Sequence, residues 1–131
     1  MKLYKIFLLI TVLTLMSITS VHAQSMARVE LEQDTVEVGA IGPYVRNVSL
    51  EIPVRNSGNT PLTIYKIKTD CICTTTSFER TPIPPGETRV VKVDIKMERF
   101  FVGENIKSIM LYTNGQELQK QIYFTFTVKE K

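Results

Sequence analysis

The sequence predicts an all-β fold, namely an antiparallel immunoglobulin-like β-sandwich of about seven strands. After the first two dozen residues no segment keeps a 3.6-residue apolar period, whereas short segments alternate apolar and polar residues at every second position. Glycine, proline and asparagine separate these segments at short intervals, which is typical of sandwiches. An open barrel is the main alternative. The cysteine-tryptophan-cysteine pattern of antibody domains is absent, because the chain has no tryptophan.

Residues 1–23 have the pattern of an export signal. Lys2 and Lys5 form a basic start, residues 6–18 are almost entirely apolar, and Val21 and Ala23 are small residues that suit a cleavage site. This apolar run is shorter than the roughly 20 residues that span a bilayer, so a retained anchor is the less favoured alternative. We expect an exported protein, periplasmic or at the cell surface, whose residues 24–131 form a single domain without a membrane span.

Charge and histidine content argue against several kinds of function. The chain has 16 basic and 13 acidic residues, and the leader contains two of the lysines, so the expected mature chain is nearly neutral. This balance argues against a nucleic-acid partner. The only histidine, His22, lies in the leader, so the mature chain lacks the imidazole of a catalytic triad, a Cys-His pair or a His-ligated metal site. We therefore expect no enzyme activity and no cofactor or metal.

Alternation places the strands along the chain as follows. They are expected near residues 27–31, 35–38, 45–54, 62–67, 91–97, 106–112 and 118–128. In the fourth segment Ile67 leaves the register of Leu62 and Ile64, which indicates a bulge near residues 65–66.

Turn-forming residues mark the connections between these strands. Pro53 cannot donate to a ladder, so the third strand is expected to meet solvent or a bulge there. Three prolines within residues 82–85 predict a stiff, extended connector. Asn114 and Gly115 together predict a hairpin turn between the last two strands.

Five motifs follow one another at characteristic intervals. They are N-S-G-N-T-P-L-T-I at 56–64, C-I-C-T at 71–74, P-I-P-P-G-E at 82–87, V-K-V-D at 91–94 and Y-T-N at 112–114. Their order resembles a bacterial exported family of unknown function, whose pattern runs Asn-x-Gly-x-x-Pro-Leu-x-Ile, Ser-Cys-Gly-Cys-Thr, Pro-Ile-x-Pro-Gly. The resemblance covers residues 34–128 and implies export and a fold similar to the Hydin-type immunoglobulin-like domain, with no known catalytic residues. Ile72 and Asp70 depart from this pattern, which has glycine and serine there.

Cys71 and Cys73, the only cysteines, form a candidate redox or disulfide pair. An oxidising compartment favours a disulfide. On a flat strand, however, residues two apart have Cα atoms roughly 6.5–7 Å apart, too far for the bond, so a local turn would be needed. Ile72 is β-branched and resists such a turn. The interpretation favoured by default is therefore two unbonded, largely buried side chains at the end of a strand.

Two chemical roles for the cysteines stay open beside these. Two thiolates on one face can hold Cu(I), with Met97 or Met110 as further soft ligands. A redox-active thiol needs a positive group nearby, and Asp70, which is negative, works against it.

Phe100 and Phe101 are the only adjacent phenylalanines and form a candidate interaction tip. The favoured alternative is that one of them plugs the end of the sandwich. Asn47 begins an N-glycosylation sequon, and Thr35 lies in a sequence that resembles a bacterial O-glycosylation acceptor, both weak signals.

Taken together, these patterns predict an exported, non-enzymatic module that binds or bridges other molecules in the cell envelope. The expected partner is an envelope protein or a glycan, and nucleic acid is not expected. The alternative function is a thiol-based redox or Cu(I)-binding protein that uses Cys71 and Cys73.

Overall fold

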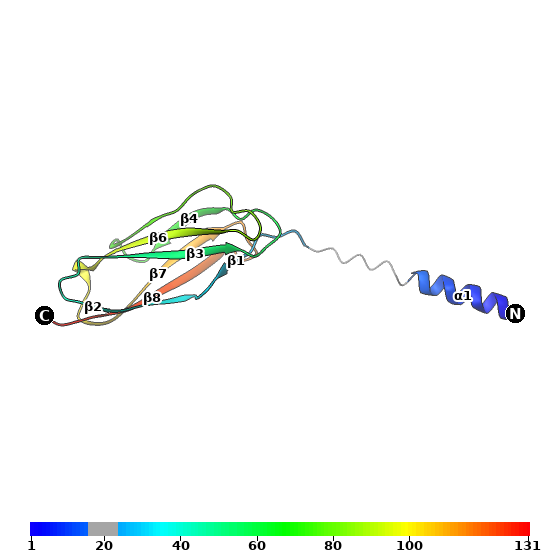
Figure 1. The fold of residues 1–131 in the computed structure, drawn as a ribbon, viewed down its shortest axis with the longest axis horizontal. Helices are drawn as coiled ribbons and strands as arrows, with labels where there is room; N and C mark the ends of the chain where they lie inside the picture. The colour runs from blue at the N-terminus through cyan, green and yellow to red at the C-terminus, as the bar shows by residue number, and fades with distance from the viewer. Residues whose placement is uncertain (16–23) are drawn as a thin grey trace.

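The computed structural model describes residues 1–15 and 24–131. Helix α1, Lys2–Leu15, lies apart from the strands and adds no residue to the core (Figure 1). The expected cleavage site at residues 21–23 lies outside the described residues. No helix within the described part of the chain is long and apolar enough to cross a membrane.

In the described part of the chain, eight strands form two four-stranded sheets, whose layers can be followed in Figure 1. They are β1 (Val29–Leu31), β2 (Thr35–Ile41), β3 (Asn47–Asn56), β4 (Ile64–Thr69), β5 (Thr74–Ser77), β6 (Thr88–Lys96), β7 (Gly103–Thr113) and β8 (Gln119–Val128). One sheet has the order β1-β3-β6-β5 and the other the order β2-β8-β7-β4. The predicted immunoglobulin-like sandwich is confirmed. The strand that the sequence did not predict is β5, whose threonine-rich sequence shows no apolar alternation.

One strand pair departs from the predicted antiparallel arrangement. β2 runs parallel to β8, with Val36 opposite Phe124 and Ile41 opposite Val128. The register shifts between Glu37 and Gly39, and Gly39 has a φ of 88°, which is the left-handed region that glycine enters without steric cost. This bulge bends β2 along the edge of the sheet.

The inward-facing residues of the two sheets form one core between the layers. Every second residue is buried along the C-terminal halves of β3 and β7 and along most of β6 and β8. The least exposed apolar residues are Val54, Leu62, Val91, Val93, Leu111, Ile122 and Phe124. Full burial of one such side chain contributes roughly 1.5–3 kcal/mol against the conformational entropy that folding costs.

Two local predictions are confirmed. The register of β4 on β7 shifts between Ile64 and Lys66, where the sequence predicts a bulge. The prediction for Pro53 on β3 also holds. The pairing of β1 with β3 ends at Leu31, which lies opposite Val54, so β1 does not reach Pro53. The missing N–H of Pro53 therefore interrupts no bond between β1 and β3.

One end of the sandwich, which we call the motif end, consists of residues 56–63, 83–87 and 113–117. Asn56 at its centre is fully buried, with 0% exposure. Its side-chain amide donates to the carbonyls of Thr60 (2.7 Å) and Ile83 (2.9 Å). Its Oδ1 accepts the N–H groups of Gly58 (3.0 Å) and Arg28 (3.3 Å). A single buried amide therefore ties three segments of the chain together with its hydrogen bonds satisfied.

A second asparagine, Asn114, joins the β7–β8 hairpin to the same end. Its Oδ1 accepts the Thr63 N–H (2.7 Å), and its amide donates to the Pro61 carbonyl (3.1 Å). Leu62 and Ile83 meet beside it as an isolated antiparallel bridge, and both are buried. Three of the five sequence motifs, those at 56–64, 82–87 and 112–114, thus meet at one place, where they fix the loops of the fold.

Candidate binding surface at the C-terminal end of the sandwich

The opposite end of the sandwich, which we call the C-terminal end, consists of residues 42–46, 97–102 and 128–131. It lies at the far end from helix α1, beside the chain's C-terminus (Figure 1). These segments surround a cavity of 590 Å³, which residues from all three of them line. Tyr44, Val45 and Val102 add exposed apolar side chains there, and charged residues of both signs, Arg46 and Glu98, lie among them. Exposed apolar side chains together with charged ones of both signs are typical of a protein-binding surface.

The two adjacent phenylalanines behave differently. Phe100 packs edge-to-face on Phe126, with ring centroids 4.9 Å apart, and the ammonium of Lys107 lies 5.6 Å from its ring centre. Phe101, in contrast, is 86% exposed. Phe100 therefore takes the plugging position that the sequence analysis favoured for one of the pair. Phe101 alone stays a candidate contact residue, and that role is still a prediction.

A short connection sets the position of Phe101. After β6 the chain makes one 3₁₀ turn, η1 (Met97–Arg99), which the Met97 N–H anchors by donating to the Arg46 carbonyl (2.8 Å). The Asn105 amide then donates to the carbonyls of Phe101 (3.0 Å) and Gly103 (2.9 Å). Sequence reasoning missed Asn105, although a polar residue on the inward face of a strand was a usable signal.

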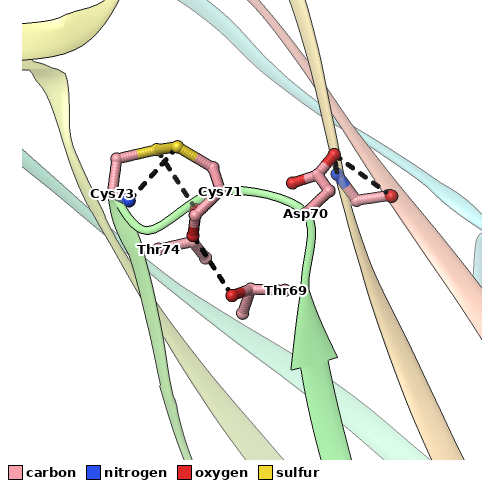
Figure 2. Close-up of a disulfide and its surroundings, with 6 residues drawn as sticks. Thr69, Asp70, Cys71, Cys73 and Thr74 are labelled. Carbon is pink, nitrogen blue, oxygen red and sulfur yellow. Dashed lines mark hydrogen bonds between the residues drawn. A yellow bond between two sulfur atoms is a disulfide. The ribbon is translucent and has the colours of Figure 1, made fainter.

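The cysteines are bonded to each other, so the default interpretation of two unbonded side chains is wrong. Cys71 and Cys73 form a disulfide with their Cα atoms 5.1 Å apart (Figure 2). They lie in the turn between β4 and β5 and not on a strand, so the strand geometry that argued against the bond does not apply. Ile72, at the tip of this turn, points to solvent and is among the most exposed apolar residues.

The two sulfur atoms differ in their surroundings. Cys73 is buried and Cys71 is half-buried. The Cys73 N–H donates to the Cys71 sulfur (3.2 Å), and the Thr69 hydroxyl donates to the Cys71 carbonyl (3.1 Å), which fixes the turn (Figure 2). A bonded pair offers no thiolate to a metal. Met97 lies in the core and Met110 on the outward face of β7, so they do not converge as the Cu(I) hypothesis requires. No group of three or more potential metal-ligating His, Cys, Asp or Glu residues occurs among the described residues.

Asp70 has a structural role that the sequence did not indicate. Its Oδ2 accepts the backbone N–H of Ser108 on β7 (2.8 Å) and lies 3.3 Å from the Ser108 hydroxyl (Figure 2). The carboxylate thus satisfies a strand donor at the point where β4 and β7 separate.

Residues 29–128 match the family described as "Protein of unknown function (DUF1573)". No curated protein matches the sequence.

Solved structures share the fold. The chain is similar to a protein of unknown function from Porphyromonas gingivalis W83, with 19% identity and a TM-score of 0.69 over 85% of this chain and 51% of that one. It is similar to the YadV chaperone, with 13% identity and a TM-score of 0.58 over 78% of this chain and 52% of that one. It is also similar to a PapD-like domain of human CEP192, with 8% identity and a TM-score of 0.56 over 82% and 89%. The chain spans about half the length of the first two, and these similarities concern the fold.

Proposed function

This chain belongs to the DUF1573 family of proteins of unknown function, and we propose that it is an exported, non-enzymatic module that binds a partner protein in the cell envelope. The observation that carries the proposal is the group of exposed apolar side chains around the cavity of the C-terminal end. Phe101 does not line the cavity but lies between Phe100 and Val102, which do, and it is more exposed than the apolar side chains of the lining. Covering such a group of side chains with a partner removes apolar surface from water, which favours binding.

Three further observations support this proposal. The leader pattern of residues 1–23 supports export. The YadV structure is described as that of a chaperone, so the same fold serves protein binding elsewhere. The order of the five motifs supports the more specific Hydin-type variant of the sandwich. A partner protein suits the exposed apolar surface better than a glycan, which needs many hydrogen-bonding side chains.

Site-specific photo-crosslinking in the native host tests the proposal. A photoreactive amino acid replaces Phe101 at the C-terminal end or, as the control, Leu118 beside the motif end, which is similarly apolar and 68% exposed. We expect a discrete protein adduct in the envelope fraction at position 101 and none at 118, and an intact mass that begins at Gln24. Equal adducts at both positions, adducts to glycan alone, or a protein retained in the cytoplasm would contradict the proposal.

A second candidate function is thiol–disulfide exchange, which the partial exposure of Cys71 favours, because an attacking thiolate can reach its sulfur. In this reaction a thiolate of a reduced dithiol protein attacks the Cys71 sulfur, and Cys73 leaves as a thiolate that takes a proton from solvent. The second thiol of the reductant then displaces Cys71, so the reductant leaves oxidised and this protein reduced.

Thiol counting separates the two functions. Wild type and the Cys71→Ser/Cys73→Ser double variant are treated with a reduced dithiol protein, and free thiols are measured with and without Cu(I). Rapid release of two thiols from wild type supports exchange. If the reductant releases no thiols and Cu(I) does not change the thiol count, the results exclude both thiol exchange and Cu(I) binding. The partner-binding function then remains.

A further inference from the structure

The N-terminal half of β7 is paired on one side only. β8 pairs with β7 from Gly103 to Tyr112, whereas β4 pairs with it only between Ile109 and Thr113. Residues 104–107, which we name the β7 edge, therefore form an open strand edge. Only Gly103 separates this edge from Phe101 and Val102, so it is continuous with the C-terminal end.

Ser108, the residue of β7 next to the open edge, shows the direction in which the free N–H and C=O groups of that edge point. The Asp70 N–H donates to the Ser108 carbonyl (3.3 Å), and the Ser108 N–H donates to Asp70 Oδ2 (2.8 Å). Since every second residue of a strand directs its N–H and C=O to the same side, those of Ile106 and Glu104 point the same way. Within the described residues neither has a hydrogen-bond partner on that side.

The disulfide turn explains why the chain itself leaves this edge uncovered. Thr69 lies opposite Ile109, so a continued β4 would bring Ile72 opposite Ile106. The bond between Cys71 and Cys73 instead holds their Cα atoms 5.1 Å apart, and the chain crosses to β5 in the other sheet. Residues of an extended strand would be roughly 6.5–7 Å apart over the same interval.

The side chains around the β7 edge suit an extended polypeptide. Ile106 is 64% exposed on the outward face of the sheet, and the exposed Phe101 and Val102 border it. Asp70 and Glu104 lie at its two ends, and neither forms an ion pair within the described residues. Two carboxylates whose negative charge no ion pair neutralises favour an incoming strand that carries basic residues.

A second copy of this chain fits the edge less well. In an antiparallel pair of two such edges centred on Ile106, Glu104 of one copy would lie opposite Ser108 of the other, beside Asp70. Like charges facing each other across a strand pair are destabilising, and charged side chains on an edge oppose self-pairing.

We propose that the β7 edge binds an extended, basic segment of a partner protein as an added β-strand. The N–H and C=O groups of Glu104 and Ile106 supply the main-chain hydrogen bonds, and the side chains of Ile106 and Phe101 supply apolar contacts. This inference rests on the proposed role of the C-terminal end in protein binding and names the form in which the partner binds.

A tethered strand tests the proposal without knowledge of the natural partner. The full-length gene is extended after Lys131 by a Gly/Ser linker of about 15 residues and a strand of alternating valine, threonine and lysine. The tether provides an effective concentration on the order of millimolar, so weak pairing becomes visible. Amide hydrogen exchange of Glu104 and Ile106 is expected to slow by about tenfold or more. Unchanged exchange at both amides would overturn the proposal.

Two variants at one position separate the backbone from the side chain. Ile106→Pro removes the N–H that points to the open edge and leaves the hydrogen bonds to β8 intact, whereas Ile106→Ala keeps this N–H. We expect the first to abolish the protection of Glu104 and the second to keep most of it. Should Ile106→Pro fail to fold by circular dichroism, Glu104→Pro replaces it, with Ile106 as the amide that is read. Equal protection in the proline and alanine variants would overturn the inference.

Two further controls test the occupant. A tether with glutamate in place of lysine is expected to protect less, and equal protection would overturn the preference for a basic strand. The untethered protein is expected to stay monomeric in light scattering. A concentration-dependent dimer with the same protected amides would assign the edge to a second copy and overturn the proposal.

The tether and the crosslinking experiment fail in different ways. If the tethered strand protects Ile106 but no partner is crosslinked at position 101, the proposed function fails and the edge remains competent. If a partner is crosslinked at 101 equally in Ile106→Pro and Ile106→Ala, the partner does not add as a strand and only the further inference fails.

Discussion

The motif end and the C-terminal end close the same sandwich in opposite ways. At the motif end, Asn56 is fully buried and each of its polar groups has a partner. At the C-terminal end, Phe101 is exposed, a cavity of 590 Å³ lies open, and the backbone of the neighbouring β7 edge lacks a partner strand. The first end is satisfied within the chain, whereas the second leaves apolar surface and hydrogen-bonding groups free for another molecule.

This difference separates what specifies the fold from what is available for function. Recognisable motifs gather at the motif end because buried asparagines and tight turns tolerate few substitutions. The C-terminal end carries no comparable motif. An exposed phenylalanine and an open strand edge exist because no other part of the chain covers them, and this leaves no pattern in the local sequence.

The largest effect is expected for Asn56→Ala, which leaves the N–H groups of Gly58 and Arg28 and the Thr60 carbonyl without partners. The Ile83 carbonyl loses one of its two donors and keeps the Leu62 N–H. We expect a loss of about 3–5 kcal/mol in the free energy of unfolding, measured by urea denaturation. Asn47→Ala at the other end of the same strand is the matched control, since Asn47 is exposed, and should change it by less than about 0.5 kcal/mol. Similar losses at both positions would erase the contrast between the ends.

A glycine pair offers the second comparison. A Cβ at Gly58 would lie 2.2 Å from the Met26 carbonyl oxygen, so Gly58→Ala should displace residues 26–28 and destabilise the fold by about 2–3 kcal/mol. A Cβ at Gly42, in the C-terminal end, would meet only ordinary contact with Val45 at 3.9 Å. Gly42→Ala should therefore be nearly neutral. Thermal unfolding of both variants, with hydrogen exchange of residues 26–28, checks the prediction, which fails if Gly58→Ala is as mild as its control.

The adjacent phenylalanines sharpen the comparison within the C-terminal end. Phe100→Ala removes the packing on Phe126 and should cost about 2 kcal/mol of stability, because the ring is only partly buried. Phe101→Ala should change stability by less than about 0.5 kcal/mol. Chemical denaturation measures both, and an equal cost at the two positions would show that Phe101 belongs to the core.

The disulfide is expected to matter less. It closes a very short loop, so the Cys71→Ser/Cys73→Ser variant should lose only about 1–2 kcal/mol. The same loss should follow when a reductant is added to wild type, whose melting temperature can be compared with that of the variant. A much larger loss would mean that the turn, and not only the bond, fails without the sulfur link.

The smallest effect concerns Lys120, at the start of β8 near the motif end. A hydrogen bond to Asp34, together with the negative charges of Asp34 and Glu117, raises the pKa of Lys120 above its usual value, although partial burial opposes the shift. The stabilisation is therefore present below the unfolded-state pKa of about 10.4 and is lost as the pH rises through the higher folded-state value. Wild type and Lys120→Met should differ by less than about 1 kcal/mol at pH 8 and converge at strongly alkaline pH. A difference that grows with pH would contradict this assignment.

Short-range patterns in the sequence predicted most of the fold. The strands around Val54, Val93 and Phe124 follow period-two alternation, and the β4 bulge follows from the misplaced Ile67. The parallel pairing of β2 with β8 was not predictable, because it joins residues nearly 90 positions apart and leaves the local pattern unchanged. β5 was not predicted, because an edge strand made of threonines and a serine shows no alternation of apolar and polar residues.

The candidate site was less predictable, for a physical reason. Cys71, Cys73 and Phe101 could be named from the sequence. The bond between the cysteines was not expected, because the sequence pattern places them on a strand, whereas they lie in a turn that brings them together. The unpaired β7 edge arises because β4 ends early and Asp70 bonds Ser108, and both are tertiary facts without a residue pattern.

The most direct test of the contrast between the two ends is the yield of crosslinked partner in the native host, with the photoreactive amino acid at position 106. Phe101→Asp and Leu118→Asp place the same charge on an exposed apolar position at either end. Both variants should accumulate as folded protein, and only Phe101→Asp should lose the adduct. Loss of the adduct in Leu118→Asp to the same extent, or its survival in Phe101→Asp, would contradict the assignment of binding to the C-terminal end.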